Sequence, residues 1–211
     1  MMNGVTFFET LKVENRKINN LDLHIKRSSE TILRHYGIIY AIPFEHLLDG
    51  YYHKEHSHKE YSLQNGIFKF RVVYSNRVLN HTLTPYSPQT VVTLKVVDCN
   101  DIEYGYKYEN RSRIESLRAL RGACDDILIV KNGYATDTSY GNVLFKLEND
   151  NNLYTPTTFL LKGTKRDFLL SKGLISEREL RTENIFECES FYMINAMVDP
   201  IPCSIQQNIQ Y

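Results

Sequence analysis

The sequence lacks an excess of charge of either sign. Its 211 residues include 25 lysines and arginines and 25 aspartates and glutamates, so the formal net charge is zero. Nucleic-acid-binding proteins usually carry a basic excess on one face, because they neutralise phosphates. We therefore expect no nucleic-acid partner, whereas a single local phosphate site fits the balance equally well.

The sequence also lacks long apolar runs and paired cysteines. Its first segment, MMNGVTFFETLKVENRK, has neither the basic start nor the apolar stretch of a secretory signal, and no run approaches bilayer-spanning length. Its four cysteines form no CxxC pair, which favours reduced packing residues. We therefore expect a cytoplasmic protein with no membrane partner.

The patterning that is present mixes strands and helices in both halves. The predicted strands cover residues 5–13, 67–74, 90–97, 127–130, 142–147 and 153–155, with a tight turn at Asn132-Gly133. The predicted helices run from an N-cap at Asn19-Asn20 to Gly37, begin near Pro43, follow Lys107, and run from Thr164 to Gly173. This mixture predicts an α+β protein of two domains, residues 1–88 and 89–211, joined at the proline-flanked segment 86–89.

Lys107 is the first candidate for chemistry. It lies in the tyrosine-rich run YGYKYENR, just before a predicted helix. Most lysines are solvated surface charges. A lysine in a partly apolar pocket, however, has its charged form disfavoured, and its free amine can attack an aldehyde.

Asp137 follows the tight turn, in GYATDTSYGN. An aspartate beside threonine and serine is usually a turn or cap residue. The alternative is a carboxylate that pairs with a protonated pyridine nitrogen and so keeps a cofactor ring electron-poor.

Two further segments suit a phosphate. Thr164 and Lys165 follow Gly163 at the start of a helix, where free amides and the helix dipole favour an anion, although simple capping by Thr164 is the plainer explanation. Arg27, in HIKR, is either a surface charge or a bidentate phosphate ligand. The polar stretch with His53, His56 and His58 has no completing carboxylate or cysteine, so we favour a solvated loop and expect no metal.

Taken in order, these segments resemble the class IV pyridoxal-phosphate enzymes. The similar stretches are FFETLKV, LDLHIKR with its HxxR pattern, KYENR, DDILIVKNGYATDTSYGNVLF, LYTPTTFLLKGTKR and YMINAMVDPIP. The resemblance implies a two-domain fold of the D-amino acid aminotransferase type (fold type IV) with an abbreviated N-terminal domain. It also implies pyridoxal 5'-phosphate as cofactor, a small-molecule amine as substrate, and a homodimer.

The resemblance also implies a role for individual residues. Lys107 would carry the cofactor covalently, and Arg27 would hold its phosphate. Asp137 stands where the family has a glutamate against the pyridine nitrogen, one methylene shorter, and Asn142 keeps the family's five-residue spacing. The phosphate would also be bound through the backbone amides of Thr164 and Lys165 and at a turn formed by Asn195 and Ala196.

Three activities stay open. KYENR and INAM are closest to aminodeoxychorismate lyases, which convert 4-amino-4-deoxychorismate to 4-aminobenzoate and pyruvate for folate synthesis, and Thr10 matches a threonine that these lyases place near the leaving group. A class IV aminotransferase acting on branched-chain or D-amino acids is the second possibility. Aminotransferases often have a tyrosine where this chain has Ser112, which favours the lyase. The third is a non-catalytic protein that binds the cofactor.

Overall fold

The structure, a computed structural model, describes residues 4–54, 66–88 and 91–206, and its chain divides into two compact units. The first unit contains Met1–Pro88 and Tyr106–Asn110, and the second contains Gln89–Gly105 and Arg111–Tyr211. The boundaries expected from the sequence assign segment 106–110, which carries Lys107, to the second domain. The structure instead groups this segment with the first unit.

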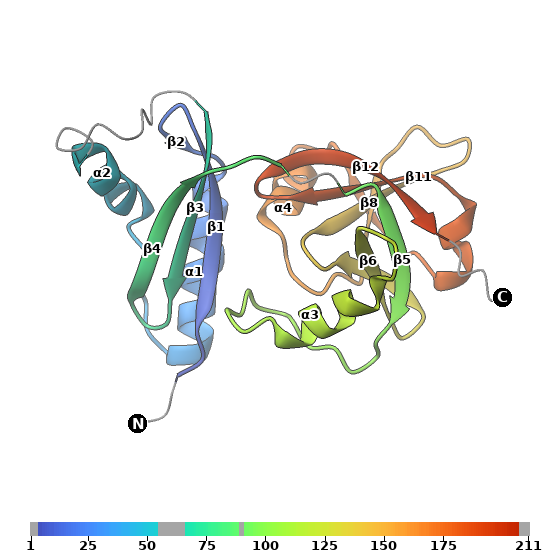
Figure 1. Ribbon diagram of the computed structural model, residues 1–211, viewed down its shortest axis with the longest axis horizontal. Coiled ribbons are helices and arrows are strands. Elements are labelled where there is room, and N and C mark those ends of the chain that lie inside the picture. Colours follow the sequence, from blue (N-terminus) through green and yellow to red (C-terminus); the bar gives the residue numbers. More distant parts are fainter. Residues whose placement is uncertain (1–3, 55–65, 89–90, 207–211) are drawn as a thin grey trace. The chain divides into compact units, whose positions relative to one another are not determined.

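The first unit is built on a four-stranded sheet with the order β2-β1-β3-β4 (Figure 1). Its strands are β1 (Phe7–Glu14), β2 (Lys17–Ile18), β3 (Ile67–Tyr74) and β4 (Val78–Pro85). Strands β1 and β3 are antiparallel and pair without a break from Phe7 opposite Tyr74 to Glu14 opposite Ile67. Neither β2 nor β4 is predicted from the sequence, because β2 is very short and β4 is an edge strand with few apolar residues.

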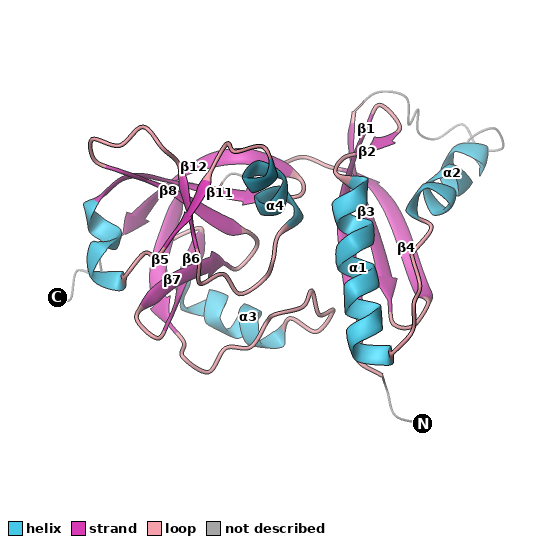
Figure 2. Cartoon of the chain, turned by 180° about the vertical axis from the view of Figure 1, so that it is seen from behind, coloured by secondary structure: helices cyan, strands magenta, loops and turns pink. Residues whose placement is uncertain are grey.

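Helix α1 (Leu21–Tyr36) is followed by α2 (Phe44–Lys54), and α1 runs along one face of the sheet (Figure 2). The N-cap residue of α1 is Asn20, but its backbone is left-handed and its side chain makes no capping hydrogen bond. The predicted N-cap position is therefore confirmed, but the left-handed backbone at Asn20 does not allow a side-chain capping bond, which needs an extended backbone there. Gly37 ends the helix with φ 67°, as the sequence predicts.

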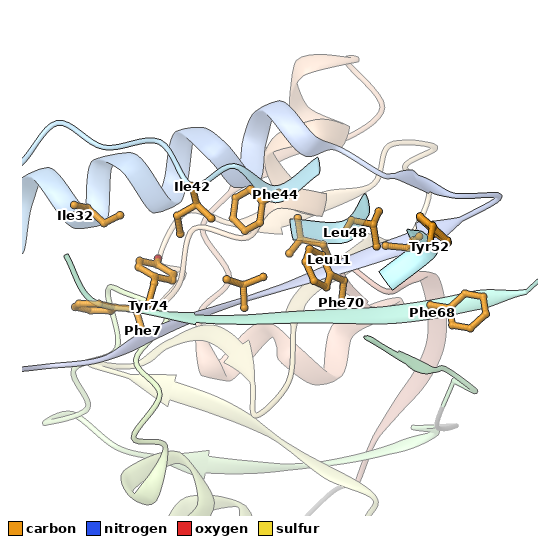
Figure 3. Packing of buried hydrophobic residues seen from close by; sticks show 12 residues of the cluster. Phe7, Leu11, Ile32, Ile42, Phe44, Leu48, Tyr52, Phe68, Phe70 and Tyr74 are labelled. Atoms are coloured by element: carbon orange, nitrogen blue, oxygen red, sulfur yellow. The ribbon is translucent and has the colours of Figure 1, made fainter. Parts of the chain in front are cut away.

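Large apolar side chains fill the space between this sheet and its helices (Figure 3). The fully buried members include Phe7 and Leu11 from β1, Ile32 from α1, and Phe70 from β3. Alternation along β1 sends Phe7, Leu11 and Val13 into the core, so Phe8 and Thr10 lie on the opposite face.

The second unit is built on an eight-stranded sheet in which six strands, β8, β11, β12, β5, β6 and β7, close into a ring. Its order is β10-β9-β8-β11-β12-β5-β6-β7, and a further pairing of β7 with β8 completes a barrel. Its strands are β5 (Thr93–Asp98), β6 (Asp126–Lys131), β7 (Tyr134–Thr138), β8 (Asn142–Leu147), β9 (Tyr154–Pro156), β10 (Ser176–Arg178), β11 (Cys188–Asn195) and β12 (Val198–Gln206). Its helical segments are α3 (Ser112–Arg118), α4 (Thr164–Ser171) and the 3-10 turns η2 (Ala119–Arg121) and η3 (Thr182–Glu187).

Local sequence explains the barrel's central hairpin. Residues Ile127 to Val130 of β6 are fully buried, as befits a strand with a neighbour on each side. Asn132 and Gly133 both have positive φ, 52° and 79°, which is the geometry of the type I′ turn that joins β6 to β7. The hairpin fixes the register of β7 and therefore the position of Asp137.

Across the described ranges, no helix is long and apolar enough to cross a membrane. The four cysteines are free thiols, and Cys99 and Cys124 are buried. His56, His58 and the side chain of His53 lie outside the described residues.

Candidate active site

Lys107 is placed by backbone pairing with β1. Phe7 and Tyr108 form an isolated antiparallel bridge, and the amide of Phe8 donates to the carbonyl of Lys107 at 3.0 Å. In this register Tyr108 shares the face of Phe7, while Lys107 shares the face of Phe8. The lysine Nζ accordingly lies over the Phe8 ring, 4.7 Å from its centroid.

Arg71 and Thr10 lie on the same face as Lys107. Arg71 of β3 pairs with Thr10 of β1, and its guanidinium carbon lies 4.7 Å from the Phe8 centroid. Arg71 also forms an ion pair with Glu109 at 3.3 Å. The Lys107 amine and the Arg71 guanidinium therefore both lie over the Phe8 ring, and Thr10 lies on the same face of the sheet. Arg71 lies in none of the motifs described above, and it is found at this site only through the pairing of β1 with β3.

A buried carboxylate holds Arg27. Nε of Arg27 donates to Oε1 of Glu9 at 2.9 Å, and Nη2 donates to Oε2 at 2.5 Å. Nδ1 of His24 lies 2.6 Å from Oε2 of the same carboxylate. The guanidinium that the resemblance assigns to a phosphate thus forms an ion pair with Glu9, while 15% of the Arg27 side chain is exposed.

The contacts within this group of Glu9, His24 and Arg27 determine which of its side chains are charged. Burial raises the pKa of Glu9, but Arg27 and His24 outweigh it and bring the pKa down to about 2. Burial lowers the pKa of His24. At neutral pH the group is therefore an ionised carboxylate facing a guanidinium and a neutral imidazole.

Sequence reasoning missed Glu9, although a signal was present. Glu9 alternates with Phe7 and Leu11 on the buried face of a predicted strand, where an acid needs a partner. The HxxR pattern on the following helix supplies two.

Asp137 is buried in the second unit and accepts three hydrogen bonds from its own chain. Its Oδ1 accepts from Nδ2 of Asn142 at 2.8 Å, and its Oδ2 accepts from the amides of Leu160 and Leu161 at 3.1 and 2.9 Å. Burial raises its pKa to about 6 even though these hydrogen bonds lower it. The residue is therefore more than a turn aspartate, because it fixes the loop that leads to α4.

Asn142 ties that loop to the carboxylate. The same Nδ2 donates to the carbonyl of Leu161 at 2.9 Å. A Cβ at position 163 would lie 1.9 Å from Oδ1 of Asn142. Only glycine therefore fits at this position while Asn142 keeps its place. Asn142 is thus placed to position Asp137 and the loop together.

Helix α4 begins directly after this glycine. Gly163 is its N-cap residue and has no side chain that could cap the helix. The first intrahelical bond is donated by the amide of Asp167 to the carbonyl of Gly163 at 2.9 Å. The amides of Thr164 and Lys165 precede that bond and lie in the first turn, at the positive end of the helix dipole. Thr164 is buried, and the Lys165 ammonium pairs with Asp199 of β12.

The turn between β11 and β12 adjoins the same region. Oδ1 of Asn195 accepts from the amide of Met197 at 2.8 Å, and Ala196 lies inside this turn. Ile194 pairs with Asn142, and a Cβ on Gly141 would lie 2.3 Å from the Ile194 carbonyl oxygen.

The predicted residues therefore form two groups, each within one unit. Arg27, Lys107 and Thr10 belong to the first unit, and the list for the second is Asp137, Asn142, Thr164, Lys165, Asn195 and Ala196. Within the described part of the chain, no group of three or more His, Cys, Asp or Glu side chains is arranged to hold a metal ion.

Comparison with known families identifies the class of this protein. The family described as amino-transferase class IV matches residues 6–205. The chain therefore belongs to the class IV aminotransferase family, whose members are pyridoxal-phosphate-dependent enzymes, and it has the α+β fold expected from the sequence. An uncharacterized protein of Haemophilus influenzae is 38% identical over 190 residues, which cover 90% of this chain and 96% of that protein.

Solved structures agree on the fold. A protein of Haemophilus somnus, provisionally described as a 4-amino-4-deoxychorismate lyase, superimposes with a TM-score of 0.77 at 30% identity, covering 93% of this chain and 98% of its own. A fold type IV transaminase of Curtobacterium pusillum also gives a TM-score of 0.77, at 16% identity, over 100% of this chain and 82% of that one. At that identity the second likeness concerns the fold alone.

Proposed function

We propose that this protein binds pyridoxal 5'-phosphate and converts 4-amino-4-deoxychorismate to 4-aminobenzoate and pyruvate. The observation that carries the proposal is the hydroxyl of Thr10 on the sheet face where Lys107 lies over Phe8. A lyase needs an amine that removes a proton and a donor near the departing oxygen. The likeness to the Haemophilus somnus protein supports the same choice.

The chemistry of the residues fits the cofactor's polar ends. A primary amine, Lys107, suits the aldehyde, and a buried carboxylate, Asp137, suits the ring nitrogen. Within the second unit, a phosphate suits the first amides of α4 and the Asn195–Ala196 turn. Arg27 stays a proposed phosphate ligand through its charge, since its Nε and Nη2 bind Glu9. When bound, the cofactor supplies an aldehyde that captures the substrate amine and a ring that accepts electrons.

The protein's own residues then divide the remaining tasks. With the cofactor bound, the Lys107 amine would take the proton from the amine-bearing ring carbon of the substrate. Asp137 would favour a protonated pyridine nitrogen, because a nearby carboxylate stabilises the charged form of the ring. Thr10 donates toward the oxygen that leaves with the pyruvyl group. Loss of that proton and that oxygen makes the substrate ring aromatic.

Transamination is the second candidate, because family members that transfer amino groups share the lysine and the acid. In that reaction Lys107 would return the proton to the cofactor, and a 2-oxo acid would accept the amino group. A non-catalytic protein that only binds the cofactor is the third candidate, and the retained Lys107 opposes it.

The direct test offers purified protein aminodeoxychorismate and, separately, pairs of branched-chain or D-amino acids with 2-oxo acids. We expect aminobenzoate and pyruvate in equal amounts, with borohydride fixing the cofactor to Lys107. Thr10→Val should retain the fixed cofactor but lose roughly a hundred-fold or more in turnover, as expected for a lost proton donor. Thr84→Val, at an exposed position of β4, is the matched control. Products of amino-group transfer without aminobenzoate would replace the lyase with the transaminase.

The proposal includes a cytoplasmic homodimer, as the resemblance implies. Sedimentation of the protein with cofactor should give twice the chain mass of 24.7 kDa. A monomer that turns over substrate would remove the dimer from the proposal and leave the chemistry standing.

A further inference from the structure

Arg111, the last residue of the KYENR motif, has no part in the chemistry proposed above, yet its side chain is well held. Its Nη2 donates to the carbonyl of Ser139 at 2.7 Å. Its guanidinium also lies over the Tyr140 ring, 5.1 Å from the centroid. Arg111 thus contacts two consecutive residues of the turn between β7 and β8.

A second contact holds the same turn from within the barrel. The Ser139 hydroxyl donates to Oδ1 of Asp126 at 2.5 Å, and both side chains are buried. Asp126 begins β6, so this bond anchors the turn to the hairpin's first strand. Arg118 adds its guanidinium to the Tyr140 ring at 5.2 Å.

Asp126 is a costly residue to keep in this place. Burial raises its pKa, and its Oδ2 is buried with no hydrogen-bond partner among the described residues. A buried acid with an idle oxygen is costly, and Arg118, whose Nε lies 3.7 Å from Oδ1 of Asp126, offsets part of that cost. What Asp126 provides is an acceptor for the Ser139 hydroxyl, which would otherwise be buried without a partner.

The turn that these two residues hold carries the acid of the site. Asp137 precedes Ser139 by two residues and Asn142 follows it by three. Within the turn, the Thr138 hydroxyl accepts from the amides of Tyr140 and Gly141 at 3.2 and 3.0 Å. These internal bonds shape the turn but do not fix it to the rest of the unit. The pairing of Thr138 with Leu128 of β6 holds the start of the turn, and the contacts of Ser139 with Arg111 and Asp126 hold its middle.

We propose that Arg111 and Asp126 are positioning residues that grip Ser139 by its carbonyl and its hydroxyl, and so hold Asp137 and Asn142 in the geometry that the bound cofactor requires. The proposal rests on the proposed function for its chemical consequence, but the grip itself is a property of the protein without cofactor.

The first experiment measures hydrogen exchange of the Thr138, Tyr140 and Gly141 amides without cofactor. Arg111→Gln removes the donor to Ser139, and Arg111→Lys is a milder form in case the first variant folds poorly. We expect exchange of these amides to rise at least ten-fold, with amides of β1 and β3 unchanged. The matched control is Glu115→Gln, which removes the other, exposed partner of Arg111 at 3.2 Å and should leave the turn unchanged. Unchanged exchange in both Arg111 variants would overturn the proposal, whatever the enzyme's activity.

Variants of Asp126 separate the acceptor from the charge. Asp126→Ala removes the acceptor and should loosen the turn as Arg111→Gln does. Asp126→Asn keeps an oxygen for the Ser139 hydroxyl and should restore slow exchange. If the Asn variant exchanges as fast as the Ala variant, charge rather than hydrogen bonding matters, and the grip as described is wrong.

The last readout is the absorption spectrum of the protein loaded with pyridoxal phosphate. A displaced Asp137 changes the protonation of the ring, so Arg111→Gln should shift the visible band and lower kcat ten-fold or more, with KM within about three-fold. A variant that is merely less stable would keep the parent spectrum, and that result would count against positioning. If the parent binds no cofactor, the proposed function fails, while the exchange experiment still decides on the grip.

Discussion

At the scale of the residue, the ionisation of Glu9 makes the free energy of unfolding depend on pH. Its pKa in the folded protein is about 2, against 4.5 for the ordinary group. A lowered pKa means that the stabilisation is present above pH 4.5 and is lost as the pH falls towards 2. We expect the difference in unfolding free energy between the parent and Glu9→Gln to shrink by about 3 kcal/mol over that range.

Urea unfolding at several values between pH 5 and pH 2.5 measures this difference. Glu14→Gln on the same strand is the control, because Glu14 is 42% exposed in its pair with Lys12 and a surface pair contributes little. A pH-independent gap between the parent and Glu9→Gln would mean that Glu9 is not ionised in the way its contacts indicate.

Asp137 offers a second residue-scale prediction. The family's glutamate is one methylene longer, but the carboxylate of Asp137 is already held by Asn142 and by the amides of Leu160 and Leu161. Asp137→Glu must move these donors or bend the strand, which costs roughly 1–3 kcal/mol. We expect lower stability in urea and a shifted cofactor spectrum. Full stability of the variant would show that the loop adapts freely.

At the scale of the element, the loop before α4 depends on one missing side chain. Gly163→Ala would put a Cβ 1.9 Å from Asn142 Oδ1, so the loop must shift. We expect affinity for pyridoxal phosphate to fall by roughly ten-fold or more, the effect of losing one charge-assisted contact. Gly50→Ala in α2, where an added Cβ meets nothing within 4 Å, is the control. Equal affinity in the two variants, measured by fluorescence titration, would exclude a shifted loop.

The elements also show where sequence patterns suffice. Periodicity and turn chemistry predicted α1, the start of α2, β3, the turn at Asn132-Gly133 and α4, because each depends on residues adjacent in the chain. The left-handed backbone of Asn20 does not follow from the helical pattern, although asparagine is one of the few residues besides glycine that adopt it readily. The edge strand β4 was missed because it is paired but poorly buried.

The site divides in the same way. The motifs singled out Lys107, Asp137 and Asn142. They did not reveal that Glu9 holds Arg27, or that Arg111 and Asp126 hold Ser139, because such contacts join residues 18, 28 and 13 positions apart. Partners at such distances are fixed by topology rather than by local pattern.

At the scale of the whole molecule, the first unit includes a segment, Tyr106–Asn110, that follows the start of the second unit in the sequence. The Tyr108 ring lies 5.2 Å from Phe7 and 6.1 Å from Tyr106 in the first unit's core. Tyr108→Ala should therefore lower the stability of that unit by about 3 kcal/mol, as large aromatic truncations do. Exchange of the β1 and β3 amides should report the loss, and Phe186→Ala, half-exposed in the second unit, should not cause it. Faster exchange confined to the second unit would contradict the assignment of segment 106–110.

That segment also sets an order of events on the ribosome. The first unit is not complete when Pro88 has been synthesised, because Tyr106–Asn110 belongs to it. Strand β1 therefore lacks the backbone partner of Phe7, Tyr108, until segment 106–110 has left the exit tunnel. By then the start of the second unit, through Gly105, has already emerged. The lysine on which the proposed chemistry depends is thus among the last residues to join the first unit.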